Sequence, residues 1–348
     1  MGHSSRELGI PFLGRPGLLN AITDVPGVAV GHCTLIDGAD IRTGVTAILP
    51  RGQSDADPVF AGWFSLSGNG EMTGTAWIEE SGCLDGPIMI TNTHSVGVVR
   101  DSVIAWQIER DRRPSQNRYG DMFWSLPLVS ETYDGFLNDI NGFHVKKEHV
   151  FAALDQAAGG EVEEGNVGGG TGMVAYGFKG GIGTSSRIVD EFTLGVLVQT
   201  NMGQRSQLTV AGVPAGLHLT EDLPARLPQE EMGSIIIVIA TDAPLLPHQL
   251  DRVAKRATMG LARTGSTAHN GSGDLFLAFS TAPIGENVRM LPNERLSAFF
   301  DAAVEGIEEA ILNAMLQAKT MTGRAGHTVT ALPHERLKEV MARFGRLT

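Results

Sequence analysis

Cysteine and long apolar runs are scarce in this sequence. Its 348 residues include two cysteines, Cys33 and Cys83, which cannot build a disulfide framework and whose spacing matches no zinc-binding pattern. The longest apolar run, Ile235–Ala240, is far shorter than the roughly 20 residues that a membrane-spanning helix needs. The first residues, MGHSSRELGIPF, also lack the apolar stretch of a signal peptide. We therefore expect a cytoplasmic protein with no membrane partner.

Basic residues are outnumbered by acidic ones. The chain has 27 Lys+Arg against 39 Asp+Glu, which gives a formal net charge of -12 at pH 7. No cluster of basic residues with interleaved aromatic residues is present in the sequence. Binding to nucleic-acid phosphates or to an anionic membrane requires such clusters. The composition therefore argues against nucleic acid as a partner.

Several common catalytic motifs are missing as well. Around Ser272 the sequence reads NGSGD, with Asn270 in place of the first glycine of the G-x-S-x-G nucleophile motif. There is no H-E-x-x-H zinc motif, phosphate-binding loop or correctly placed dinucleotide fingerprint. The run Gly168–Gly172 precedes an expected strand instead of opening a helix, so we interpret it as close packing of backbone against backbone.

Glycine and apolar residues are abundant. The 44 glycines and 42% hydrophobic residues predict many tight turns around a substantial core. Apolar runs bounded by Gly, Asn, Asp or Pro indicate strands at Val28–Ile36, Val45–Leu49, Ile88–Thr91, Met173–Phe178, Leu194–Thr200, Ile235–Thr241 and Leu275–Ser280. Helical periodicity indicates helices near Val98–Glu109, Leu250–Leu261, Leu296–Ala314 and Glu335–Phe344. Buried strands with helices on both sides predict a layered α/β sandwich, and no break in composition divides residues 1–348 into separate domains.

One segment differs from the rest of the chain. Val213–Gly233 contains three prolines and four acidic residues without any sustained periodicity, so we expect a long exposed loop. It ends at Gly233-Ser234, directly before the most apolar strand. If the chain were cut there, Ser234 would carry a hydroxyl and a free α-amine side by side, and an α-amine can act as a base near neutral pH. Taken alone, however, a Gly-Ser pair before a strand is an ordinary turn.

The sequence around this junction resembles the L-aminopeptidase/D-esterase and β-peptidyl aminopeptidase family, whose members are self-processing hydrolases with an N-terminal serine. The resemblance extends over essentially the whole chain. The blocks that carry it are Gly9–His32, Thr91–Gly97 (TNTHSVG), Val129–Asp139 (VSETYDGFLND), Gly165–Met173, Lys179–Arg187, Val198–Gly203 (VQTNMG), Gly233–Leu250, Asn270–Thr281 (NGSGDLFLAFST) and Thr320–His334.

The resemblance implies an αββα sandwich of four layers, with the family's own connectivity, that cuts itself between Gly233 and Ser234. The products would be an α chain of residues 1–233 and a β chain of residues 234–348. Ser234 would be the nucleophile for its own release and then for the substrate. Ser272 would contact the α-amine or the hydroxyl of Ser234, and Asp274 would hold Ser272 and stabilise positive charge during proton transfer. Their i, i+2 spacing places both side chains on one face of a strand.

Three further residues match family positions. Asn201 in TNMG corresponds to the asparagine that stabilises the oxyanion of the reacting carbonyl. Glu131, which taken alone would be a solvated surface acid, is expected to pair with the free amino group of the substrate. Tyr133 is expected to donate a hydrogen bond near the reacting carbonyl.

The sequence therefore predicts an aminopeptidase or amidase that releases N-terminal residues from small peptides, amides or esters through an acyl-enzyme on Ser234. The resemblance implies no metal or organic cofactor and a homo-oligomer, a homotetramer of αβ units. L-amino, D-amino and β-amino acyl groups all remain possible substrates. Two alternatives stay open: an aminoacyl transferase of the same fold, and an unprocessed homologue that binds small molecules without catalysis.

Overall fold

Two β-sheets form the centre of the protein. The structure, a computed structural model, describes residues 4–112, 123–220, 233–285 and 287–347. A four-stranded sheet has the order β1 (Ala29–Asp37), β2 (Ile41–Leu49), β5 (Ile88–Asn92), β6 (Leu128–Thr132). A six-stranded sheet has the order β4 (Cys83–Leu84), β3 (Val59–Gly68), β12 (Gly273–Ser280), β11 (Ser234–Thr241), β10 (Phe192–Asn201), β9 (Gly181–Val189).

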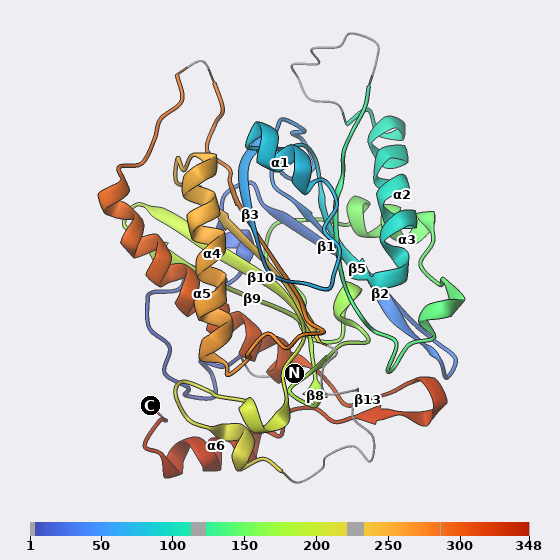
Figure 1. Ribbon diagram of the computed structural model, residues 1–348, viewed down its shortest axis with the longest axis vertical. Helices are drawn as coiled ribbons and strands as arrows, with labels where there is room; N and C mark the ends of the chain where they lie inside the picture. The colour runs from blue at the N-terminus through green and yellow to red at the C-terminus, as the bar shows by residue number, and fades with distance from the viewer. Residues whose placement is uncertain (1–3, 113–122, 221–232, 286, 348) are drawn as a thin grey trace.

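Helices cover the outer face of each sheet (Figure 1). The helices α2 (Val96–Glu109) and α3 (Lys147–Asp155) pack on the four-stranded sheet, whereas α4 (Pro247–Arg263) and α5 (Leu296–Gln317) pack on the six-stranded sheet. Three apolar cores separate these layers, one between the two sheets and one beneath each helix pair. The order of layers is thus helix, sheet, sheet, helix, and the four-layer αββα prediction is confirmed.

The strand β11 is buried on both faces. Ile236 and Val238 point into the core between the sheets, while Ile235 and Ile237 point toward the core beneath α4 and α5. Side chains alternate between the two faces of a strand, so an apolar residue is needed at every position. This double burial explains why the run Ile235–Ala240 lacks alternation.

The predicted helices are confirmed within a few residues. α2, α4 and α5 coincide with the periodic segments, and α6 (His334–Arg343) coincides with the fourth. In α4 the periodic apolar side chains face the core and the charged ones face outward, as an amphipathic helix requires. The part of the chain that the structure describes contains no helix long and apolar enough to cross a membrane.

Two segments differ from the sequence prediction. The predicted strand Met173–Phe178 is a short hairpin of β7 (Val174–Ala175) and β8 (Phe178–Lys179), because Tyr176 and Gly177 have positive φ values of 51° and 70° that reverse the chain. The expected exposed loop is also wrong at its beginning: Val213, Ala215 and Leu219 are buried. The rest of that loop, residues 221–232, lies outside the described residues.

Other elements were not predicted. These are β3, β4, β6, β9, α1 (Thr75–Ser81), α3 and a hairpin of β13 (Met321–Thr322) and β14 (Thr328–Val329). β9 (GIGTSSRIV) and β6 (LVSET) are rich in polar residues yet almost entirely buried, so they lack the apolar signature of a core strand. The interpretation of Gly168–Gly172 is confirmed, because an added Cβ at Gly170 would come within 2.5 Å of the Ile182 backbone nitrogen.

Candidate active site

The predicted nucleophile begins a central strand. Ser234 is the first residue of β11 and is 6% exposed. It is paired with Asn201, the last residue of β10, on one side and with Gly273, the first residue of β12, on the other. Three of the predicted segments, VQTNMG, GSIII and NGSGD, therefore meet at one end of the six-stranded sheet.

Ser272 and Asp274 form a hydrogen-bonded pair, as their spacing predicts. The Ser272 hydroxyl donates to Asp274 Oδ1 at 2.7 Å, and both residues are buried. Burial raises the pKa of Asp274 to about 6, against the opposing effects of the Ser272 hydroxyl and the Ile235 backbone N–H. The second carboxylate oxygen, Oδ2, is buried and has no hydrogen-bond partner among the described residues. The pair thus retains an unused acceptor beside β11.

The register of β11 indicates which group of Ser234, its hydroxyl or its backbone nitrogen, Ser272 could contact. Asp274 shares the helix-side face of its strand with Phe276, whereas Ser234 alternates onto the face of Ile236, toward the other sheet. The Ser272–Asp274 pair consequently lies on the opposite face from the Ser234 hydroxyl. Between the two possible contacts, the geometry favours the backbone nitrogen of Ser234, which becomes the α-amine if the chain is cut.

The Gly233–Ser234 peptide is held from the neighbouring strand. The Gly273 backbone N–H donates to the Gly233 carbonyl oxygen at 3.2 Å. A backbone N–H aimed at this oxygen would also stabilise negative charge on it. The carbonyl that would be attacked if the chain cut itself here is therefore already polarised in the uncut chain.

The Asn201 amide is fixed at both ends. The Val174 backbone N–H donates to Asn201 Oδ1 at 2.9 Å, and Asn201 Nδ2 donates to the Tyr133 carbonyl oxygen at 2.9 Å. These two contacts determine which end of the amide is oxygen and which is nitrogen. One N–H of Nδ2 remains for a reacting carbonyl, which suits the oxyanion role predicted for Asn201.

Glu131 is buried, so the interpretation as a solvated surface acid is wrong. It lies in β6 and is 2% exposed. The Thr93 hydroxyl donates to Glu131 Oε2, and the Glu71 backbone N–H donates to Oε1 at 3.0 Å. Burial raises its pKa, and these two donors oppose the shift. A carboxylate buried in this way is suited to receiving an ammonium group from a ligand.

Gly70 connects the carboxylate to the end of the central sheet. A Cβ added to Gly70 would lie 3.2 Å from both Glu131 Oε1 and the Gly273 Cα. Gly273 is in turn the register partner of Ser234. The backbone at Gly70 therefore packs between Glu131 and the strand beside the nucleophile, on the face toward which Ser234 points.

Tyr133 enters the site in two ways. Its carbonyl binds Asn201, and its phenol group packs on the Gly135 backbone, where an added Cβ would clash with the ring. The side chain is half-buried. The six predicted residues thus come together at one end of the six-stranded sheet, where each lies in or directly beside β6, β10, β11 or β12.

Sequence reasoning missed the residues that support these side chains. Thr93 and Glu71 hold Glu131, Val174 holds Asn201, and Asn69 holds the NGSGD turn by donating its backbone N–H to the Ser272 carbonyl at 3.1 Å. Thr93 and Val174 lie inside or directly beside the blocks TNTHSVG and Gly165–Met173. These two blocks were the only indication in the sequence that Thr93 and Val174 matter. The role of each supporting residue depends on contacts between segments that are distant in the sequence.

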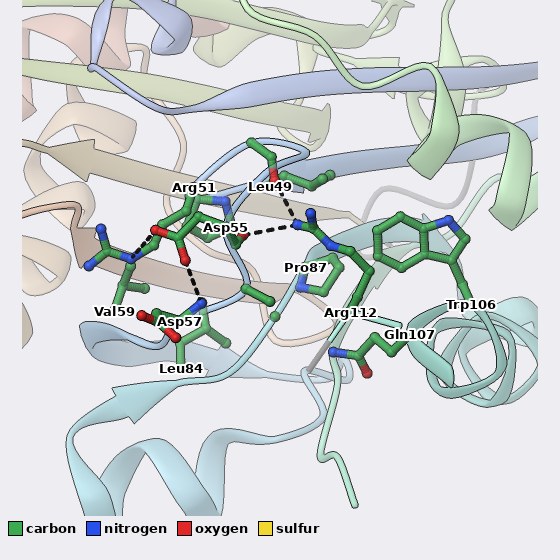
Figure 2. Close-up of a pocket in the computed structure, with 14 residues that line it drawn as sticks. Leu49, Arg51, Asp55, Asp57, Val59, Leu84, Pro87, Trp106, Gln107 and Arg112 are labelled. Atoms are coloured by element: carbon green, nitrogen blue, oxygen red, sulfur yellow. Dashed lines mark hydrogen bonds and ion pairs between the residues drawn. The ribbon is translucent and has the colours of Figure 1, made fainter. Parts of the chain in front are cut away.

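A separate small pocket lies between the end of β2, the loop after it and α2 (Figure 2). Arg112 stacks over Trp106 and donates to the carbonyls of Gly52 and Asp55. Its guanidinium and that of Arg51 therefore bind backbone carbonyls of the protein itself. None of the predicted site residues lines this cavity. Within the described residues, no group of three His, Cys, Asp or Glu side chains is placed to hold a metal ion.

A helix-covered pair of sheets in which a buried serine begins a central strand defines the class of N-terminal-nucleophile hydrolases. The model of peptidase family S58 matches residues 20–329, and the chain belongs to this family. It is 50% identical to the β-peptidyl aminopeptidase BapA of Sphingosinicella microcystinivorans, covering 99% of this chain and 93% of that protein. The corresponding enzyme of Sphingosinicella xenopeptidilytica is 46% identical, and the match covers 99% of this chain and 92% of that protein.

Solved structures agree with this assignment. The L-aminopeptidase D-Ala-esterase/amidase of Ochrobactrum anthropi, described as a prototype of the serine aminopeptidases and a variant of the Ntn hydrolase fold, superimposes with a TM-score of 0.92 at 48% identity and covers 99% of both chains. A β-aminopeptidase of a Burkholderia species superimposes with a TM-score of 0.90 at 47% identity, and the match again covers 99% of both chains. The chain is therefore an enzyme, an aminopeptidase/amidase with the Ntn hydrolase fold.

Proposed function

We propose that this chain cuts itself between Gly233 and Ser234, and that the freed Ser234 is the nucleophile of a broad-specificity aminopeptidase. The observation that carries the proposal is the register at the end of the central sheet. Ser234 lies between Asn201 and Gly273, and the hydrogen-bonded Ser272–Asp274 pair flanks Gly273 on the neighbouring strand. A hydroxyl, an oxyanion donor and a carboxylate that faces an amine are the groups that acyl transfer by an N-terminal serine requires.

Self-cleavage begins with attack of Ser234 Oγ on the Gly233 carbonyl carbon. The oxyanion that forms is stabilised by the Gly273 N–H, which already bonds this oxygen. The C–N bond then breaks, and the departing amine takes up the proton that the Ser234 hydroxyl loses on attack. Water hydrolyses the resulting ester and leaves a carboxylate on Gly233 and a free α-amine and hydroxyl on Ser234.

Substrate turnover repeats this chemistry on an external carbonyl. The α-amine of Ser234 accepts the hydroxyl proton as Oγ attacks, and the Ser272–Asp274 pair stabilises the ammonium that forms. Asn201 Nδ2 donates its remaining N–H to the oxyanion, with Tyr133 beside it. The leaving amine departs with the proton from the ammonium, and water then releases the acyl group from Ser234.

Glu131 defines the substrate as a molecule with a free amino group. Its buried carboxylate would bind the substrate ammonium while Ser234 attacks the carbonyl carbon. These two anchors hold the ends of the acyl residue and leave its middle loosely specified, so both α- and β-amino acyl groups suit the site. The β-peptidyl and D-alanyl activities named for similar proteins support this breadth. Comparing hydrolysis of β-alanyl and L-alanyl p-nitroanilides tests the proposal; no release of p-nitroaniline from either would contradict it.

We expect Glu131→Gln to raise KM sharply for substrates with a free amine. The variant keeps the size of the side chain but removes the charge that pairs with the substrate ammonium, and a charged hydrogen bond is worth about 1.5–3 kcal/mol, or roughly 10- to 100-fold. Steady-state kinetics with β-alanyl p-nitroanilide measures this change. Glu164→Gln is the matched control, because Glu164 is a half-buried glutamate on another part of the fold, where it accepts the Thr184 backbone N–H, and desolvation raises its pKa to about 8. Equal KM values for the Glu131 variant and the unaltered enzyme would contradict the assignment.

We expect self-cleavage to slow as the pH falls through about 6. Burial raises the pKa of Asp274 to about this value, so its carboxyl loses its negative charge well above the usual range for an aspartate. Below its pKa it no longer stabilises the departing amine, and the rate falls about tenfold per pH unit. The dependence of the cleavage rate on pH can be measured by following freshly translated chain on denaturing gels at a series of pH values.

The control for this profile is a second aspartate. Asp242, at the other end of β11, accepts the Thr193 backbone N–H at 2.8 Å, and burial raises its pKa as well. The variant Asp242→Asn should keep the inflection near pH 6, whereas Asp274→Asn should be slow at every pH and lack it. An inflection that persists in Asp274→Asn would assign the titration to another group.

We also propose that the cleaved α and β chains stay associated and assemble as a homotetramer in the cytoplasm. The α-chain strands β9 and β10 and the β-chain strands β11 and β12 share one sheet, so separating the chains would expose its centre. Light scattering on the purified protein tests the tetramer. Fractionation of cells tests the location.

A further inference from the structure

Two buried charged residues lie in the segments whose backbone holds the Asn201 amide. Lys179 and Asp134 are both 0% exposed. Burial lowers the pKa of the Lys179 ammonium to about 7, and the negative charge of Asp134 acts in the opposite direction. The reaction scheme above uses neither residue, and a charge buried this deeply is costly unless other groups compensate for it.

Lys179 anchors the segment that orients one end of the Asn201 amide. Its ammonium donates to the backbone carbonyls of Met173 at 2.8 Å, Gly180 at 3.0 Å and Gly170 at 3.3 Å. Three N–H groups thus meet three carbonyls and tie residues 170–180 into one compact turn. This turn contains Val174, whose N–H donates to Asn201 Oδ1.

Asp134 anchors the segment that holds the nitrogen end of the Asn201 amide. It follows Tyr133, whose carbonyl accepts the hydrogen bond from Asn201 Nδ2. Its carboxylate accepts the side-chain amide groups of Asn92 and Asn138, each at 3.0 Å. These bonds fix the backbone at residues 133–134 against β5.

The two anchored segments touch each other at Gly172. An added Cβ there would lie 2.9 Å from the Asp134 Cβ, so the Lys179-bound turn packs directly on Asp134. We propose that Lys179 and Asp134 are positioning residues for the oxyanion donor: each fixes one of the two backbone groups that orient the Asn201 amide. The inference rests on the proposed role of Asn201 in the reaction.

A double-mutant cycle on kcat tests this proposal. Lys179→Met removes the charge and keeps the length of the side chain; we expect kcat to fall by about 10- to 100-fold with little change in KM, because a misplaced donor weakens only transition-state binding. In the Asn201→Ala background the same change should cost little further activity, since the donor it positions is gone. Rates are counted per chain with a free Ser234 amine, measured by intact mass.

Two further variants keep the result interpretable. Asp134→Asn preserves the volume and should repeat the cycle if Lys179→Met does not fold. Arg187→Met removes another buried cation, paired with Glu309 at 2.7 Å, and should lower Tm without lowering kcat. Full additivity of Lys179→Met with Asn201→Ala would overturn the proposal, as would an Lys179→Met chain that stays uncut while Asn201→Ala is cleaved. If Asn201→Ala itself leaves kcat unchanged, the oxyanion role fails instead.

Discussion

We expect replacement of Ser234 by alanine to leave a full-length, folded chain of 37.0 kDa with no hydrolytic activity. The substitution removes the oxygen that we propose attacks the Gly233 carbonyl, so neither the chain break nor the acyl-enzyme should form. β11 should fold normally, because the Ser234 side chain lies at the end of the strand and the backbone pairing with β10 and β12 is unchanged. Denaturing gels and p-nitroanilide hydrolysis together measure both losses.

Two further variants, Ser280→Ala and Ser234→Cys, serve as controls for this experiment. Ser280→Ala removes a buried hydroxyl at the far end of β12, where it donates to the Ala243 carbonyl at 2.6 Å, and should leave cleavage and activity intact. Ser234→Cys keeps a nucleophile at the same position and should retain slow cleavage. A Ser234→Ala chain that is still cut at residue 233 would show that another group attacks this bond.

Replacing Asn201 by alanine should lower kcat by about 100- to 1000-fold, the usual cost of removing one donor from an oxyanion hole. KM should change little, because the lost bond forms with the oxyanion of the transition state. Self-cleavage should be less affected, since the Gly273 N–H already bonds the Gly233 carbonyl at 3.2 Å. Steady-state kinetics on the cleaved variant measures the effect.

The matched control is Asn313→Ala. Asn313 is a buried asparagine in α5 that donates to the Thr184 carbonyl at 3.0 Å, away from Ser234. It should lower the stability of the protein and leave kcat unchanged. A loss in Asn201→Ala no greater than in Asn313→Ala would mean that the Asn201 amide does not bind the oxyanion.

The elements with regular apolar patterns could be predicted from the sequence. β11 and α4 are examples, because one is apolar at every position and the other has a single apolar stripe. β9 was missed because its buried positions are filled by Gly, Thr, Ser and Arg, and its polar side chains are stabilised by partners such as Glu309 and Asp24. Such partners are distant in sequence, and no local pattern indicates them.

The sequence and its family resemblance were enough to propose the site residues, but not to predict their environment. Ser272 and Asp274 share one face, as their spacing predicts. That this face lies opposite the Ser234 hydroxyl depends on the register between β11 and β12, which no single segment encodes. The burial of Glu131 likewise depends on Thr93 and on the chain at residues 70–71, brought together by folding.

The most direct test of this account is the mass of the freshly purified protein under denaturing conditions. Cleavage between residues 233 and 234 divides the 37.0 kDa chain into fragments of about 25 and 12 kDa in proportion to their lengths. We predict both masses, with the smaller fragment beginning Ser-Ile-Ile-Ile. A single uncut chain that nonetheless hydrolyses aminoacyl p-nitroanilides would contradict the central claim, because Ser234 would then have no free amine.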